Sequence, residues 1–217
     1  MAIGNRAYSV GGSSAQTEEL WKSFRRHVFS LLHMAYRRLP APSFKTAEEP
    51  EITGELACAM REIVESEDAP KWMYALSIHD DPPQNTTPRR GKHRPRLDLE
   101  IERSGAGIRP RYGFEAKRLC KPGHPIGKYG GKTGYLGKDG LGMFIDGAYA
   151  SYSPEVGMLG YVQSGTTEEW RDACRQRLGS TQCVPCKPIN DLEIHQSTHM
   201  RDTGRPIDIY HLFLIFR

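Results

Sequence analysis

The sequence predicts an α/β (α+β) protein, in which helices flank a mixed central β-sheet and a further helix lies at the N-terminus. Three observations predict this class. Apolar residues recur at helical spacing within the first 64 residues, and five later segments have strand-like patterns. A capping box predicts one more helix near residue 170. The 217 residues, 38% of them hydrophobic, suffice for one core. We therefore expect a lead-in and amphipathic helix over residues 1–45, packing on the core or on a partner, and one domain over residues 46–217.

Two helices are expected before the first strand. Residues 17–39 carry apolar side chains on one face, and the chain then meets the sequence Pro-Ala-Pro, which ends a helix. Trp21 and Phe24 on that face indicate core packing, with docking onto a partner subunit as the alternative. Residues 52–64 predict the second helix, with Leu56 and Met60 turned inward.

Three strands are expected next. Residues 71–79 are rich in aromatic and aliphatic side chains, and a Pro-rich, basic surface loop over residues 80–96 follows them. Residues 96–102 alternate strictly between apolar and acidic side chains. A Gly-containing turn separates them from the strand over residues 112–119, so these two strands predict a hairpin.

The remaining elements complete the sheet. Residues 121–142 are rich in Gly and Lys and predict irregular structure, followed by a short helix within residues 142–150. Residues 156–162 predict a core strand. Thr166 and Glu169 form a capping box that opens a helix ending near residue 178. Residues 208–216 predict a hydrophobic closing strand.

Acidic and basic side chains occur among the apolar residues of the predicted hairpin, and their spacing places them on one face. Residues two apart on a strand point to the same face, so Glu115 and Lys117 project together, about 7 Å apart along the chain. In the hairpin, Asp98 on the preceding strand faces the same side. Two carboxylates at short range repel each other, and a divalent cation reverses that effect.

Oxygen ligands of this kind suit Mg²⁺ or Mn²⁺, which can polarise a phosphate and lower the pKa of a bound water. A neighbouring lysine can orient or deprotonate that water, or stabilise the transition state. Asp98, Glu115 and Lys117 therefore predict a site for phosphodiester hydrolysis. The alternatives are a surface salt bridge between Glu115 and Lys117 on an edge strand, and a solvated polar face formed by Asp98, Glu100 and Glu102.

Asp98, followed after a turn by Glu115-Ala116-Lys117 in an apolar strand, resembles the PD-(D/E)xK nuclease superfamily with its restriction-endonuclease-like fold. The resemblance covers roughly residues 50–217, and it implies metal coordination by the Asp98 and Glu115 carboxylates with Lys117 at the attacking water. The stretches FEAKRL, GMLGYV and HLFLIF are similar to small nucleases of bacterial antiviral defence operons. The implied protein is a metal-dependent endonuclease that hydrolyses DNA.

The match departs from the family pattern at its first residue. Asp98 follows Arg96 and Leu97 instead of a proline, which leaves Glu100 as an alternative first ligand. The family often adds an acidic residue from an early helix. Glu55 is the candidate for this third metal ligand, ahead of Glu62 and Glu51.

Two basic runs flank the predicted site and could follow a phosphate backbone. They contain the candidate nucleic-acid-binding residues Arg90, Lys92, Arg94, Arg118, Lys121, Lys128 and Lys132. The net charge of +4 agrees with a polyanionic partner, although solubilising loops are the alternative reading. A chain of this size could also need a larger regulatory partner such as an ATPase.

Cysteine usage indicates the compartment and a second metal. The 5 cysteines, an odd number, and the lack of an apolar core behind a basic tip at the start lead us to expect free thiols, a cytoplasmic protein and no membrane association. Cys183, Cys186, His195 and His199 have the character of a structural Zn²⁺ site. The alternative is a pair of buried or half-exposed thiols, with His199 near the active cleft.

Two other functions stay open at this stage. The chain could keep the fold as a binding subunit for nucleic acid or a partner without turnover. It could also be a zinc-stabilised interaction protein.

Overall fold

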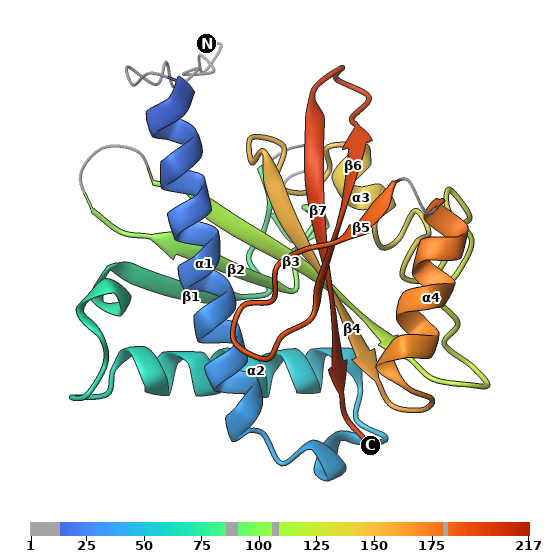
Figure 1. Cartoon of the computed structure of the whole chain (residues 1–217), viewed down its shortest axis with the longest axis horizontal. Helices are drawn as coiled ribbons and strands as arrows, with labels where there is room; N and C mark the ends of the chain where they lie inside the picture. Colours follow the sequence, from blue (N-terminus) through green and yellow to red (C-terminus); the bar gives the residue numbers. More distant parts are fainter. Residues whose placement is uncertain (1–13, 86–90, 106–108, 180–181) are drawn as a thin grey trace.

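The computed structural model, which describes residues 14–85, 91–105, 109–179 and 182–217, is organised around one seven-stranded mixed sheet (Figure 1). The strand order is β1-β2-β3-β4-β7-β6-β5. Strands β1, β2 and β3 are antiparallel, β3, β4 and β7 are parallel, and β7, β6 and β5 are again antiparallel. The strands are β1 (Leu76–Asp80), β2 (Leu99–Arg103), β3 (Arg111–Leu119), β4 (Glu155–Val162), β5 (Cys183–Pro185), β6 (Ile194–Met200) and β7 (Pro206–Ile215).

Four α-helices lie in the described part of the chain, and they pack on both faces of the sheet (Figure 1). They are α1 (Ser14–Arg38), α2 (Glu49–Val64), α3 (Gly142–Ile145) and α4 (Thr167–Leu178), with short 3₁₀ helices η1 (Ala41–Phe44), η2 (Lys71–Ala75) and η3 (Gly91–His93). None of the helices within these residues combines the length and the apolar character that a membrane crossing requires. The mixed α/β class with an N-terminal helix is thus confirmed.

The larger core lies between the sheet and the two long helices α1 and α2. Phe29 of α1 packs edge-on against Tyr112 of β3, with ring centroids 5.4 Å apart, and it also contacts Phe114. Phe24 is buried and Trp21 is partly buried against the same core. The N-terminal helix therefore packs on the sheet of its own chain. This agrees with the prediction that Trp21 and Phe24 belong to the core.

A second core fills the opposite face. It is built by α3, α4 and the segment between β3 and β4, which pack on β4, β5 and β7. Trp170 of α4 and Phe144 of α3 are buried there together with Met158 of β4. The predicted capping box of α4 is confirmed, because Thr166 and Glu169 exchange both of its hydrogen bonds at 3.2 Å.

The hairpin is also confirmed, whereas the first strand is shorter than predicted. Leu99 of β2 lies opposite Phe114 of β3 in an antiparallel register. Residues 71–75 form η2 instead of a strand, because Pro70 begins a tight turn in which the Met73 N–H donates to its carbonyl at 2.8 Å. The strand β1 begins only after that turn, at Leu76.

Gly157 of β4 faces the Phe114 ring closely, which gives a stability prediction. A Cβ atom at residue 157 would lie 2.2 Å from two atoms of that ring, and the ring is fully buried between its neighbours. We expect Gly157→Ala to lower the free energy of unfolding by about 1–3 kcal/mol, measured by urea denaturation, because an overfilled core must shift.

Gly54 of α2 supplies the matched control. A Cβ atom there meets no heavy atom within 4 Å, and the residue lies in a helix interior. Gly54→Ala should raise the free energy of unfolding by about 0.5–1 kcal/mol. Equal effects of the two substitutions would contradict the packing described at β4.

Candidate functional site

The candidate site lies where β3 extends past the beginning of β2. Since β2 starts at Leu99 opposite Phe114, the last part of β3 has β4 on one side and, within the described residues, no strand on the other. Two carboxylates accept the backbone N–H groups left free on that open side. Asp98 Oδ2 accepts from the Ala116 N–H at 2.6 Å, and Glu49 Oε2 accepts from the Arg118 N–H at 3.0 Å.

Lys117 joins these carboxylates to Glu115. Its ammonium nitrogen lies 2.7 Å from Glu115 Oε1 and 3.1 Å from Glu49 Oε1, and it also donates to the Ala116 carbonyl at 2.9 Å. Three protein oxygens thus fix the position of the amine. The side chains come from α2 and β3, which are far apart in the sequence.

Asp98 and Glu115 lie on the same side of the sheet. Continued by one residue past Leu99 and Phe114, the antiparallel register puts Asp98 opposite Glu115, and directly opposed residues share a face. The strand β3 lies inside the sheet between β2 and β4, and Glu115 is only 3% exposed. A surface salt bridge on an edge strand therefore does not describe the Glu115–Lys117 pair.

Burial and mutual repulsion make negative charge costly in this cluster. Burial raises the pKa of Glu115 well above its ordinary value, and the Asp98 charge raises it further, although Lys117 opposes both effects. Burial likewise raises the pKa of Asp98 and of Glu49. Tyr149, from the segment after α3, lies near these carboxyls. Its burial and the charges of Glu115 and Asp98 raise the pKa of its hydroxyl.

The donor set fits a hard divalent cation. Glu115 Oε2 is buried and has no hydrogen-bond partner among the described residues, so one carboxylate oxygen is available beside Asp98. Carboxylate oxygens are the ligands that Mg²⁺ and Mn²⁺ take from proteins. Asp98 and Glu115 could hold such an ion, with Glu49 on the far side of Lys117.

The raised carboxyl pKa values predict how stability depends on pH and magnesium. Between the ordinary carboxyl pKa and the raised folded values, the folded protein binds more protons than the unfolded chain, so the free energy of unfolding falls as pH rises. Lys117 has a raised pKa and contributes stability that is fully present below the ordinary lysine value, so it does not oppose this trend near neutral pH.

Mg²⁺ should offset that loss at pH 8, by about 1.4 kcal/mol when its concentration is ten times its Kd. Urea denaturation at pH 5 and pH 8, with and without Mg²⁺, measures both effects. In Glu115→Gln the magnesium effect should disappear and the decline with pH should shrink. An equal magnesium effect in wild type and Glu115→Gln would contradict a cation at these carboxylates.

The structure brings Glu49, rather than the predicted Glu55, to Lys117. Both residues lie on α2, but six helical residues separate their directions by about 120° around the axis, and Glu55 is exposed. Glu51 and Glu62 are exposed as well. Glu49 was missed because the predicted helix began at residue 52; Pro50 in the first turn was the available signal.

Glu100 and Glu102 have other partners. Arg111 lies 3.7 Å from a Glu100 carboxylate oxygen and 3.3 Å from one of Glu102. Glu102 also lies 3.8 Å from His79 of β1. Asp98 is consequently the acidic residue of this segment that lies beside Glu115 and Lys117.

The predicted nucleic-acid-binding residues are only partly gathered at the site. Arg118 is half-buried, with its guanidinium 2.9 Å from Glu48, and Lys121 follows on the surface, 3.8 Å from Glu169.

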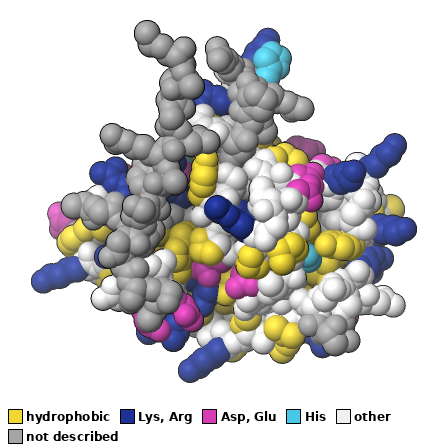
Figure 2. Space-filling view, turned by 90° about the horizontal axis from the view of Figure 1, so that it is seen from above, with side chains coloured by type: hydrophobic (Ala, Val, Ile, Leu, Met, Phe, Trp, Pro, Cys, Tyr) yellow, Lys and Arg dark blue, Asp and Glu magenta, His cyan; other side chains and the backbone are white. Residues whose placement is uncertain are grey.

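The other predicted nucleic-acid-binding residues lie elsewhere. Lys128 and Lys132 are exposed in the segment whose Tyr129 contacts His199 of β6. Lys92 is exposed in η3, Arg94 contacts Asn85, and Arg90 lies outside the described residues. Figure 2 shows Lys and Arg side chains projecting separately around the outline of one face, among the residues drawn in colour.

The four predicted zinc ligands do not converge. Cys183 is buried in the second core, whereas Cys186, three residues later on an extended chain, packs beside the first core and lies 3.7 Å from Gln196. His195 and His199 of β6 are both buried, and His199 contacts Ser197 and Tyr129. Cys183 instead lies near Cys174 of α4 and His211 of β7.

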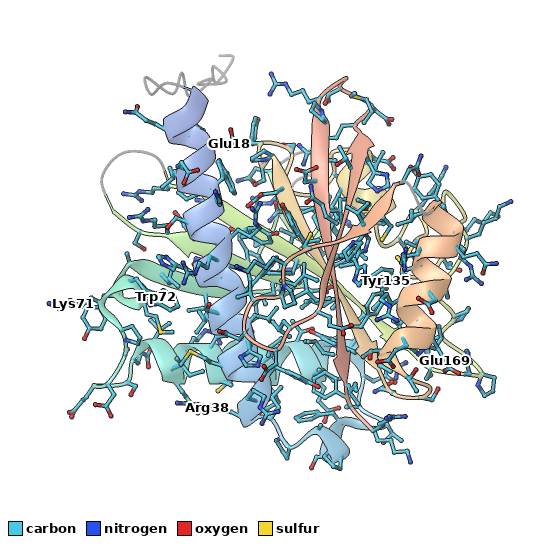
Figure 3. The ribbon with its side chains drawn as sticks, in the orientation of Figure 1. Glu18, Arg38, Lys71, Trp72, Tyr135 and Glu169 are labelled. Carbon is cyan, nitrogen blue, oxygen red and sulfur yellow. The ribbon has the colours of Figure 1, made fainter. Side chains whose placement is uncertain are left out.

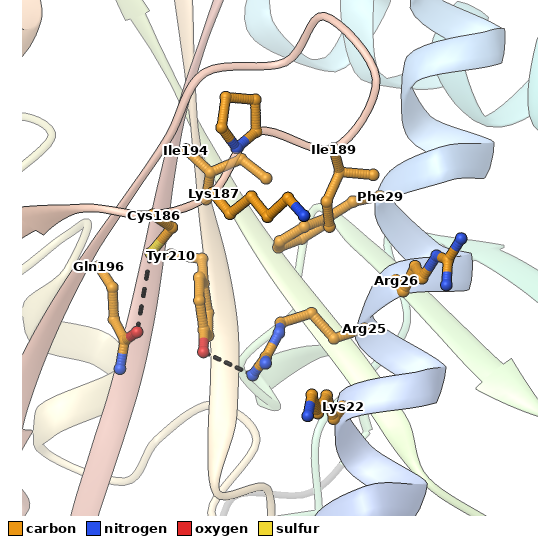
Figure 4. A pocket seen from close by; sticks show the side chains of 11 residues that line it. Lys22, Arg25, Arg26, Phe29, Cys186, Lys187, Ile189, Ile194, Gln196 and Tyr210 are labelled. Atoms are coloured by element: carbon orange, nitrogen blue, oxygen red, sulfur yellow. Dashed lines mark hydrogen bonds between the residues drawn. The ribbon is translucent and has the colours of Figure 1, made fainter.

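A separate hollow lies between α1 and the chain around Cys186 (Figure 4). Its volume is about 510 Å³, and it shares no lining residue with the carboxylate cluster. Arg25 donates to the Tyr210 hydroxyl at 2.5 Å across it, and Lys187 lies on the opposite wall.

Comparisons of this chain with family models, curated proteins and solved structures return no match. The geometry of the described residues is therefore the basis of the functional proposal.

Proposed function

We propose that this protein is a metal-dependent endonuclease that hydrolyses phosphodiester bonds of nucleic acid, with DNA as the substrate. The observation that carries the proposal is the cluster at the open part of β3: the Glu115 carboxylate, with one buried oxygen unpartnered, beside Asp98 and 2.7 Å from the Lys117 amine. Repelling buried carboxylates next to a fixed amine are costly unless a cation and an anionic substrate complete the site.

Asp98 and Glu115 would hold Mg²⁺ or Mn²⁺. When bound, the ion would supply Lewis acidity towards a phosphate oxygen and lower the pKa of a water ligand. The side chains of this protein would fix the position of the ion and limit the access of water to it, since Glu115 is almost wholly buried.

Lys117 has the properties of an electrostatic group rather than a base. Burial lowers its pKa, but the charges of Glu115 and Glu49 raise it by more, so the net shift is upward and the amine stays protonated at neutral pH. A positive charge held by three oxygens can orient the attacking water and stabilise negative charge that develops on the phosphate. Glu49 then acts as a positioning residue for that amine.

The fold supports the same proposal. A mixed sheet flanked by helices is what the resemblance to the PD-(D/E)xK superfamily implies, and the motif residues lie on the adjoining strands β2 and β3 or next to them. Arg118 and Lys121, directly after the motif, could contact the substrate backbone. A role in antiviral defence is also proposed on the resemblance alone, and an ATPase-like regulatory partner is proposed on the small size of the chain.

Incubation of supercoiled plasmid with the full chain tests the proposal. We expect nicking and linearisation with Mg²⁺ or Mn²⁺ and none with EDTA, followed on agarose gels, with an RNA and a single-stranded DNA of equal length as parallel substrates. Salt-sensitive binding without cleavage in either metal would contradict the nuclease proposal and favour a binding subunit.

A further inference from the structure

The second core contains a group of soft metal ligands that the nuclease proposal does not use. Cys174 of α4, Cys183 of β5 and His211 of β7 each offer one ligand atom, and these atoms all lie within 4.8 Å of one another. Each of the three residues is at most 1% exposed. Figure 1 shows β5 between α4 and the β6–β7 pair, and Figure 3 shows Tyr135 close to the same region.

The hydrogen bonds around His211 leave one of its ring nitrogens available to a metal. Its Nε2 lies 2.8 Å from Ser197 Oγ, which lies 2.8 Å from His199 Nε2, and His199 Nδ1 lies 3.2 Å from the Tyr129 hydroxyl. With a proton on His211 Nε2, His211 donates to Ser197 Oγ, and the Ser197 hydroxyl donates to His199 Nε2. His199 Nδ1 then donates to the Tyr129 hydroxyl, so each of these groups has a partner. His211 Nδ1 then carries a lone pair directed towards Cys174.

Tyr135 is the nearest hydroxyl to that lone pair, and it has a second acceptor. Its oxygen lies 3.1 Å both from His211 Nδ1 and from the Met158 carbonyl oxygen, and a single proton donated to the carbonyl leaves Nδ1 without a donor. The Cys174 sulfur lies 4.0 Å from Nδ1, and a thiol is a weak donor.

His195 supplies an independent observation. It lies directly opposite His211 on the adjoining strand β6, it is 6% exposed, and its Nδ1 is buried without a hydrogen-bond partner among the described residues. Side chains directly opposed on antiparallel strands have Cβ atoms about 5 Å apart. A rotation of the His195 side chain would bring a fourth ligand to the group.

We infer that Cys174, Cys183 and His211, completed by His195, form a structural Zn²⁺ site that ties α4 to the strands β5, β6 and β7. Two thiolates, two neutral imidazoles and Zn²⁺ have no net charge, which suits a buried position, and binding releases one proton from each thiol. Tetrahedral zinc sites place ligand atoms about 3.3–3.8 Å apart, so the described group needs only a small contraction. Ser197 would orient His211 through its second ring nitrogen.

Metal analysis of the purified full chain, prepared without metal-affinity columns, tests this inference. We expect about one zinc per chain in wild type, in Cys186→Ser and in Glu115→Gln, and at least a tenfold lower content in Cys183→Ser. Cys186→Ser is the matched control, because that thiol packs beside the other core. Glu115→Gln separates the zinc site from the nuclease site, since only nuclease activity should be lost there.

A second measurement covers the case in which Cys183→Ser does not fold. Metal-stripped wild type should bind one Co²⁺ with the visible absorption of a tetrahedral thiolate complex, and His195→Gln should bind it at least about tenfold more weakly. The inference is overturned if wild type binds neither Zn²⁺ nor Co²⁺ stoichiometrically, if Cys183→Ser keeps its zinc, or if Cys174 and Cys183 form a disulfide in metal-free protein.

Discussion

Glu115→Gln is expected to reduce Mg²⁺-dependent plasmid cleavage by at least about 100-fold while the protein stays folded. The substitution keeps the size of the side chain but removes the negative charge that holds the cation, and catalysis of phosphate hydrolysis depends on that charge arrangement. The substitution also removes the ion pair in which the Lys117 amine lies 2.7 Å from Glu115 Oε1. Initial cleavage rates on agarose gels, together with circular dichroism spectra, measure the effect and the fold.

Glu100→Gln is the matched control for that substitution. Glu100 is also a buried carboxylate, 6% exposed on the adjoining strand, but its partner is Arg111. Its cleavage rate should stay within about threefold of wild type. If Glu100→Gln loses activity and Glu115→Gln keeps it, the assignment of Glu115 as the metal-holding carboxylate is wrong.

Glu49→Ala is expected to lower the cleavage rate by roughly 10–100-fold, the range found when a supporting partner of a catalytic metal site is removed. Glu49 Oε1 lies 3.1 Å from the Lys117 amine, and its other oxygen accepts the Arg118 N–H, so it holds two parts of the motif. Without it, Lys117 keeps Glu115 but loses one of its three oxygens. Single-turnover cleavage at saturating protein measures this loss separately from substrate binding.

Glu55→Ala on the same helix provides the comparison. Glu55 is exposed and points about 120° away from Glu49 around α2, so its removal should change the rate by less than about twofold. Glu49→Asp should recover part of the activity, because it keeps the charge. A larger effect of Glu55→Ala than of Glu49→Ala would contradict the arrangement at the start of α2.

Local patterns were sufficient to predict the hairpin and the residues on its shared face. The alternation in β2 and the apolar flanks of Glu115 and Lys117 set the register, and the structure places Asp98 beside the end of that register. The capping box at Thr166 likewise predicted the start of α4. Each of these signals depends on residues close together in the sequence.

The contribution of Glu49 could not be predicted in the same way. It depends on how α2 meets the open side of β3, about 69 residues further along the chain. The structure separates the four predicted zinc ligands for a related reason. The spacing of Cys183 and Cys186 suggested a pair, but an extended chain turns residues three apart to opposite faces, and the nearest thiol to Cys183 comes from α4.

The length of the first strand shows a third limit. Residues 71–79 have strand-like composition throughout, yet the first five form η2. Composition does not distinguish a 3₁₀ turn after Pro70 from a strand, because the choice depends on the turn geometry.

Anomalous diffraction from crystals soaked in Mn²⁺ shows directly whether Asp98 and Glu115 hold a hard divalent cation beside Lys117. We expect a manganese peak within coordination distance of both carboxylates in wild type and no such peak in Glu115→Gln. A map in which the carboxylates of wild type hold no manganese, while Glu115→Gln crystals show the same peaks as wild type, would contradict it.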